Sequence, residues 1–103
     1  MAEMVARQHA PATQASVLRS LNLLAHRLER VLLSLGADGN ADAELRSIAD
    51  GVIEAVDQSP DVALASIYLN QIAGPYGVRH CVEAAIICAL VAPSISTIAA
   101  ALT

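Results

Sequence analysis

Residues 14–35, QASVLRSLNLLAHRLERVLLSL, contain the clearest periodic pattern in the chain. Aliphatic residues recur there at alternating intervals of four and three. That spacing places them on one face of an amphipathic helix, which Gly36 is positioned to end. We call this face the α-seam, and its residues are Val17, Leu21, Leu24, Leu28, Val31 and Leu35. The pattern predicts a long helix over residues 14–35.

The α-seam has two possible partners. In one interpretation it covers the rest of the same chain as the apolar face of an amphipathic helix. In the other it is the interface of a homodimer, or of a complex with another helical protein, because the residues occupy the a and d positions of a short coiled coil. The sequence leaves both open.

Two further helices follow a turn over residues 37–41, which is rich in residues that tolerate unusual backbone angles. The second helix is expected over 42–57, with Asp42 as its N-cap. Ser59-Pro60-Asp61 then combines a capping residue, a proline at the first helical position and an acidic first turn. A third helix is therefore expected to run to Asn70. The residues expected to be buried are Leu45, Ile48, Ala49, Val52, Ile53 and Val56 in the second helix, and Val62, Leu64, Ile67 and Tyr68 in the third.

A fourth helix is expected over residues 76–92, after the break at Ala73-Gly74-Pro75. Pro93 is expected to end it, and Ser94 could cap a short last helix. No strand-like alternation of convincing length occurs. The sequence therefore predicts an all-α fold of about four to five helices.

The composition narrows the class of protein. Hydrophobic residues make up 55% of the chain, yet Phe and Trp are absent, so the core must be built from Ala, Leu, Ile and Val. The net charge is −4, and the six basic residues are scattered arginines. A nucleic-acid interface needs a clustered basic surface, so we expect no nucleic-acid partner.

Cysteine usage and hydropathy indicate a cytoplasmic protein. Cys81 and Cys88 would lie about 10 Å apart along a helix, too far for a disulfide, and are expected to be buried thiols. An intermolecular or redox-sensing thiol is the alternative.

Residues 84–102 carry no charge and approach the length of a membrane span. Pro93 and nearby hydroxyl residues interrupt the run and no basic residue follows it, so we favour a buried helix pair over a membrane span or tail anchor.

His80 is the strongest candidate for a functional residue, as a possible metal ligand. It lies three residues before Glu83, so the two side chains would share a helix face and could offer one nitrogen and one oxygen ligand to a metal. Two ligands do not complete a site. A phosphate-binding loop is absent, and adjacent His80 and Cys81 would point about 100° apart on a helix.

Residues 59–92 resemble the opening of an HD-type phosphohydrolase domain, most closely the HD-GYP branch, which hydrolyses cyclic di-GMP. The resemblance rests on Ser59-Pro60-Asp61, the Tyr76-x-x-x-His80 segment and the run of small and aliphatic residues after it, about a third of the chain. It implies that His80 corresponds to the first metal ligand of the family, with Tyr76 one turn earlier.

The resemblance also has limits. The His-Asp dyad and the Gly-Tyr-Pro signature of the family are absent, and no His or Asp follows His80. We therefore expect a non-catalytic or truncated member, an incomplete HD-like bundle with no cofactor of its own; Fe or Mn is implied by the family only. The expected organisation is a flexible leader over 1–13, a two-helix lead-in over 14–58 and the start of an HD-like domain over 59–103.

Overall fold

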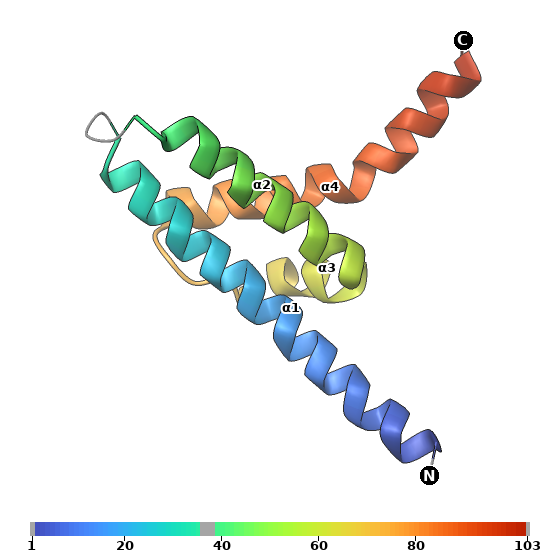
Figure 1. The fold of residues 1–103 in the computed structure, drawn as a ribbon. Helices are drawn as coiled ribbons and strands as arrows, with labels where there is room; N and C mark the ends of the chain where they lie inside the picture. Colours follow the sequence, from blue (N-terminus) through green and yellow to red (C-terminus); the bar gives the residue numbers. More distant parts are fainter. Residues whose placement is uncertain (1, 36–38, 103) are drawn as a thin grey trace.

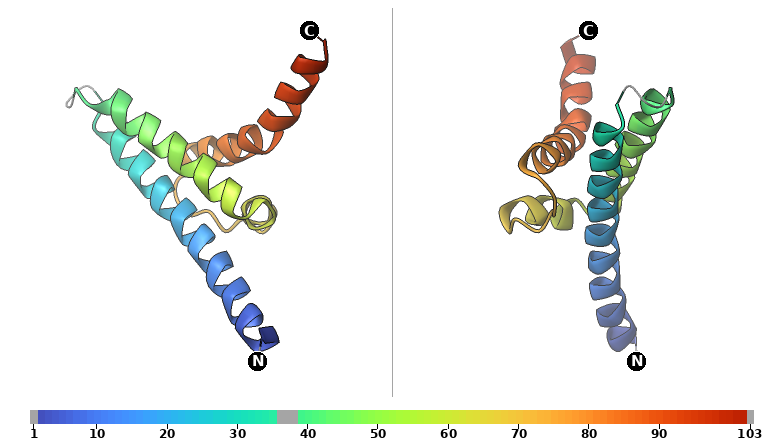
Figure 2. Two further views of the ribbon diagram at one scale, coloured as in Figure 1. Left: turned by 45° about the vertical axis from the view of Figure 1, so that its right-hand side comes forward. Right: turned by 90° about the vertical axis from the view of Figure 1, so that its left-hand side faces the viewer.

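The computed structural model describes residues 2–35 and 39–102, with side chains from residue 14 onward. Within these ranges the chain forms four helices and no strand, which confirms the predicted all-α fold. The helices are α1 (Ala2–Leu33), α2 (Ala41–Gln58), α3 (Pro60–Tyr68) and α4 (Tyr76–Leu102). Helices α1 and α2 run antiparallel side by side, and α3 and the first half of α4 cover one side of this pair (Figures 1 and 2).

Helix α1 is longer than the sequence pattern predicted. It begins at Ala2 rather than near residue 14, so most of the predicted leader is helical, and it ends at Leu33. Its first turns extend beyond the other helices (Figure 1). The predicted stop at Gly36 and part of the predicted turn over 37–41 lie outside the described residues.

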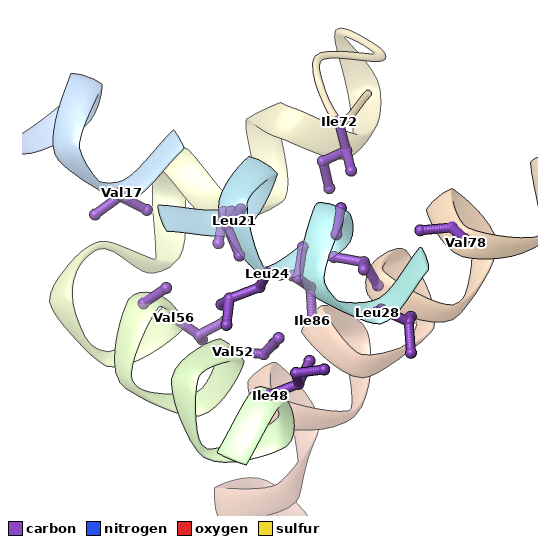
Figure 3. Packing of buried hydrophobic residues seen from close by; sticks show 14 of the residues in the cluster. Val17, Leu21, Leu24, Leu28, Ile48, Val52, Val56, Ile72, Val78 and Ile86 are labelled. Carbon is purple, nitrogen blue, oxygen red and sulfur yellow. The ribbon is translucent and has the colours of Figure 1, made fainter. Parts of the chain in front are cut away.

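A single hydrophobic core joins all four helices. The α-seam supplies its centre, since Val17 and Leu21 are fully buried and Leu24, Leu28 and Val31 nearly so (Figure 3). Leu35, by contrast, is 58% exposed. The structure thus uses five of the six seam residues inside the chain, and a dimer through them would require this core to open. The core also includes residues on both sides of the predicted boundary at 58/59, so the two predicted segments share one core.

A glycine allows α1 and α2 to approach closely. A Cβ placed on Gly51 would lie only 2.7 Å from Cδ2 of Leu24, so a larger residue there would require the buried Leu24 side chain to shift. Beside this contact the Arg27 guanidinium lies 2.8 Å from the Glu44 carboxylate and donates a hydrogen bond to Ser47 Oγ. The close approach explains why a residue with poor helix propensity occupies the middle of α2.

Helices α2 and α3 bury narrower faces than predicted. The buried side chains are Ile48, Val52, Ala55 and Val56 in α2 and Ala63 and Ser66 in α3. In α3 the small Ala63 and Ser66 face the core, so the larger side chains point outward or stay half-buried. The predicted core residues Leu45, Ala49, Ile53, Leu64 and Tyr68 are exposed.

Helix α4 continues through Pro93, so the predicted break into two helices was wrong. Proline removes one helical hydrogen bond and commonly bends a helix rather than ending it. Figures 1 and 2 show such a bend in the second half of α4, beyond which the helix projects away from the bundle. After the proline, the Thr97 hydroxyl donates a hydrogen bond to the Pro93 carbonyl at 3.0 Å.

Candidate functional site

The candidate site is the first half of α4, and it is positioned by the end of α3. Asn70 adopts a left-handed conformation (φ 53°), which Asn tolerates better than most residues. This geometry lets the Asn70 N–H bond the Ile67 carbonyl and the Gln71 N–H bond the Ser66 carbonyl. These two bonds form a Schellman motif, which ends α3 at Tyr68 rather than at the predicted Asn70.

The loop between α3 and α4 is fixed to α1 by one side chain. Asn22 donates a hydrogen bond to the Gln71 carbonyl at 3.2 Å and accepts one from the Ala73 N–H at 2.8 Å. Between these two anchors Ile72 inserts into the core and is 2% exposed (Figure 3). Asn22 thereby fixes the loop that leads into α4.

The start of α4 is set by the backbone at Gly74 and by two hydrogen bonds of Arg79. Gly74 has a φ of 122°, a conformation that favours glycine, and Pro75 follows. The Pro75 carbonyl accepts a hydrogen bond from the Arg79 N–H at 3.0 Å. The Arg79 side chain donates to Asn70 Oδ1 at 2.7 Å, which links α4 back to the end of α3.

His80 lies on the solvent side of α4. Its imidazole stacks on the Tyr76 ring one turn earlier, with ring centroids 5.7 Å apart and an interplanar angle of 14°. Both residues are exposed. The Tyr76-x-x-x-His80 spacing therefore produces one aromatic pair on the helix surface.

The residues around His80 do not fit a catalytic metal. Glu83 is the one carboxylate near it on α4, and a catalytic zinc-type site takes three protein ligands. Across residues 2–35 and 39–102 no three His, Cys, Asp or Glu side chains gather closely enough to hold an ion. No metal-dependent step can be derived from this arrangement.

The two cysteines differ from their prediction. Cys81 and Cys88 are free and both are exposed, whereas we expected buried thiols. The buried face of α4 is formed by Val78, Val82 and Ile86. Both cysteines lie off this face, because the core contacts only one side of the helix.

The exposed apolar surface of α4 contradicts the expectation that residues 84–102 form a buried helix pair. Every described residue from 91 to 102 is exposed, including Ile95 at 60% and Ile98 at 58%. By length and composition α4 could also cross a membrane. The core helix of a soluble protein can have the same length and composition, but such a helix is mostly buried, whereas little of the apolar part of α4 is buried.

Sequence reasoning located His80 and Tyr76 on one helix face but missed the residues that position them. Asn70 was expected at the end of the third helix, and no pattern in the sequence singled out Asn22. The one available signal was Asn70 itself, since Asn is a common residue just past a helix end. No family model matches this chain, and neither a curated protein nor a solved structure matches it.

Proposed function

We propose that this chain is a non-catalytic helical module related to the HD-GYP-like phosphohydrolases, working in the cytoplasm. The resemblance of residues 59–92 supports the relationship. The observation that carries the non-catalytic part is the setting of His80: an exposed imidazole stacked on Tyr76, with no cluster of further ligands among the described residues.

Hydrolysis of a phosphodiester by this family requires metal-activated water. One imidazole and one carboxylate at most can bind a divalent ion weakly and exchangeably. Without catalysis, the role we propose for the chain is binding to other helices. An all-α bundle with an exposed apolar helix is suited to such binding.

The activity is tested with purified chain, cyclic di-GMP and either Mn²⁺ or Fe²⁺, with His80→Ala as the matched control. We expect no turnover above the rate of the control. Turnover that disappears in His80→Ala would show a working metal site and would overturn the non-catalytic assignment.

The relationship needs a separate test, because inactivity alone does not establish it. Homologous genes should encode a Tyr-x-x-x-His helix that aligns with residues 76–80 and continues to an HD dyad. Homologues in which residue 80 varies freely, with no dyad, would contradict the relationship while leaving the helical module intact.

A further inference from the structure

One face of α4 carries a continuous exposed stripe. Starting at Tyr76, its positions recur at intervals of four, four and three residues along the whole helix. At about 100° per residue these positions fall within roughly 100° of the helix circumference. We call this the α4 stripe, and its residues are Tyr76, His80, Ala84, Ile87, Val91, Ile95, Ile98 and Leu102, all exposed.

The α4 stripe faces away from the core of its own chain. The buried residues of α4 are Val78, Val82 and Ile86, about half a turn around the helix from the stripe. Its repeat of three positions in eleven residues corresponds to 3.67 residues per turn, close to the 3.6 of a straight helix. A second helix could therefore follow the stripe along each straight part of α4, before and after the bend at Pro93 (Figure 1).

A lipid bilayer fits this surface poorly. Residues 91–102, the part exposed throughout, span only about 18 Å, whereas a hydrocarbon core is about 30 Å thick. Extending the span to Ala84 would pull Ile86, which is fully buried, out of the core. A helix lying on the membrane surface usually carries Lys or Arg on its polar face, and residues 84–102 contain neither.

We propose that the α4 stripe is the interface of a homodimer, in which α4 of one copy packs along α4 of a second. Beyond residue 90 the large aliphatic side chains of α4 are confined to the stripe, and the other positions from 92 to 101 are Ala, Ser, Thr or Pro. No charge lies between residues 84 and 102, so the stripe carries no pattern that would select a charged partner or repel its own copy. A two-fold interface of identical surfaces is the commonest protein assembly.

The expected dimer is reversible. Two stripes packed together would bury roughly 1,000 Å² in total, near the lower limit of a specific interface. Interfaces at this end of the size range are typical of transient complexes, so we expect monomer and dimer to exchange. This proposal does not depend on the relationship to HD-type enzymes.

Sedimentation velocity of the full chain over a wide concentration range tests the proposal. We expect a monomer–dimer equilibrium that Ile95→Glu with Ile98→Glu weakens by roughly 100-fold or more, because two charges would be desolvated in the interface. Ser96→Glu is the matched control: it adds a charge on the opposite side of the same turn and should leave the dimer intact. Circular dichroism of each variant should match the wild type, since Ile95, Ser96 and Ile98 are exposed.

Three results would overturn the proposal. The first is a wild-type chain that stays monomeric up to millimolar concentration. The second is a dimer that survives both glutamates but dissociates when Leu35→Glu is introduced, which would place the contact at the end of the α-seam. The third is a monomer that co-sediments with phosphatidylcholine–phosphatidylglycerol vesicles and loses this binding with the two glutamates, which would assign the stripe to lipid.

Discussion

Two helix faces in this molecule carry aliphatic residues at similar spacing, but one is buried within the chain and the other is exposed. The α-seam of α1 is closed within the chain by α2, α3 and α4, and its central residues are nearly inaccessible. The α4 stripe has the same kind of residues on one helical face, yet it points away from the core. Periodicity predicts that a helix face is apolar, but whether the chain itself covers that face depends on where its other helices lie.

The largest effect is expected when one side chain is truncated on each of the two faces. Leu21→Ala removes a fully buried side chain from the α-seam and should lower the free energy of unfolding by about 2–5 kcal/mol. Ile98→Ala on the α4 stripe should change it by less than about 0.5 kcal/mol in the monomer. Urea unfolding followed by circular dichroism at low protein concentration measures both. Equal losses would show that the stripe is buried within the monomer.

A second test uses two glycines. Gly51→Ala would place a methyl group 2.7 Å from Leu24 of the α-seam, and this overpacking should cost about 1–3 kcal/mol despite the better helix propensity of Ala. Gly77 lies in the first turn of α4 with no atom within 4 Å of an added Cβ, so Gly77→Ala should be neutral or stabilise by up to about 1 kcal/mol. Thermal unfolding of the two variants should move in opposite directions. A stabilising Gly51→Ala would mean that α1 and α2 pack less tightly than described.

The smallest effect concerns the ion pair beside the α-seam. Arg27 and Glu44 are 37% and 41% exposed in their side chains, so Arg27→Ala should cost no more than about 1 kcal/mol, and less in high salt. Arg46→Ala, which breaks the more exposed pair with Asp42 at 3.5 Å, should have no measurable effect. Urea unfolding at low and high ionic strength distinguishes the two. A large, salt-independent loss at Arg27 would instead indicate packing of its alkyl chain.

The sequence was informative where a single local rule decides the outcome. The α-seam, the proline at the start of α3 and the start of α4 at Tyr76 follow from periodicity and from the positions of proline and glycine, and each is present. The predicted caps differ: α2 begins at Ala41, so Asp42 is its second residue rather than its N-cap, and Ser59 precedes α3 without a side-chain capping hydrogen bond. Leu35 and Tyr68 carried the same apolar signal, yet both are exposed: Leu35 lies past the end of α1, and Tyr68 is the last residue of α3, which buries Ala63 and Ser66 instead. Pro93 was expected to stop α4, but a proline can be accommodated by bending where the helix has room to project.

The candidate site shows the same division. The shared face of Tyr76 and His80 could be predicted from a spacing of four residues, and the structure adds their stacking. Exposure of Cys81 and Cys88 could not, because it depends on which side of α4 meets the core. Asn22 lies 49 residues from Gln71 in the chain, and no local pattern reports a contact at that separation.

The two hydrogen bonds between Asn22 and the loop after α3 have a consequence for how the molecule opens. The loop over residues 71–73 has no regular secondary structure. Even so, the Ala73 N–H donates a hydrogen bond to the Asn22 side chain of α1, and the Ile72 side chain is buried in the core. Fluctuations that free this loop must therefore loosen its contact with α1. Hydrogen exchange at Ala73 should be slow for a loop amide and should match the middle of α1, so that loop and helix behave as one cooperative unfolding unit.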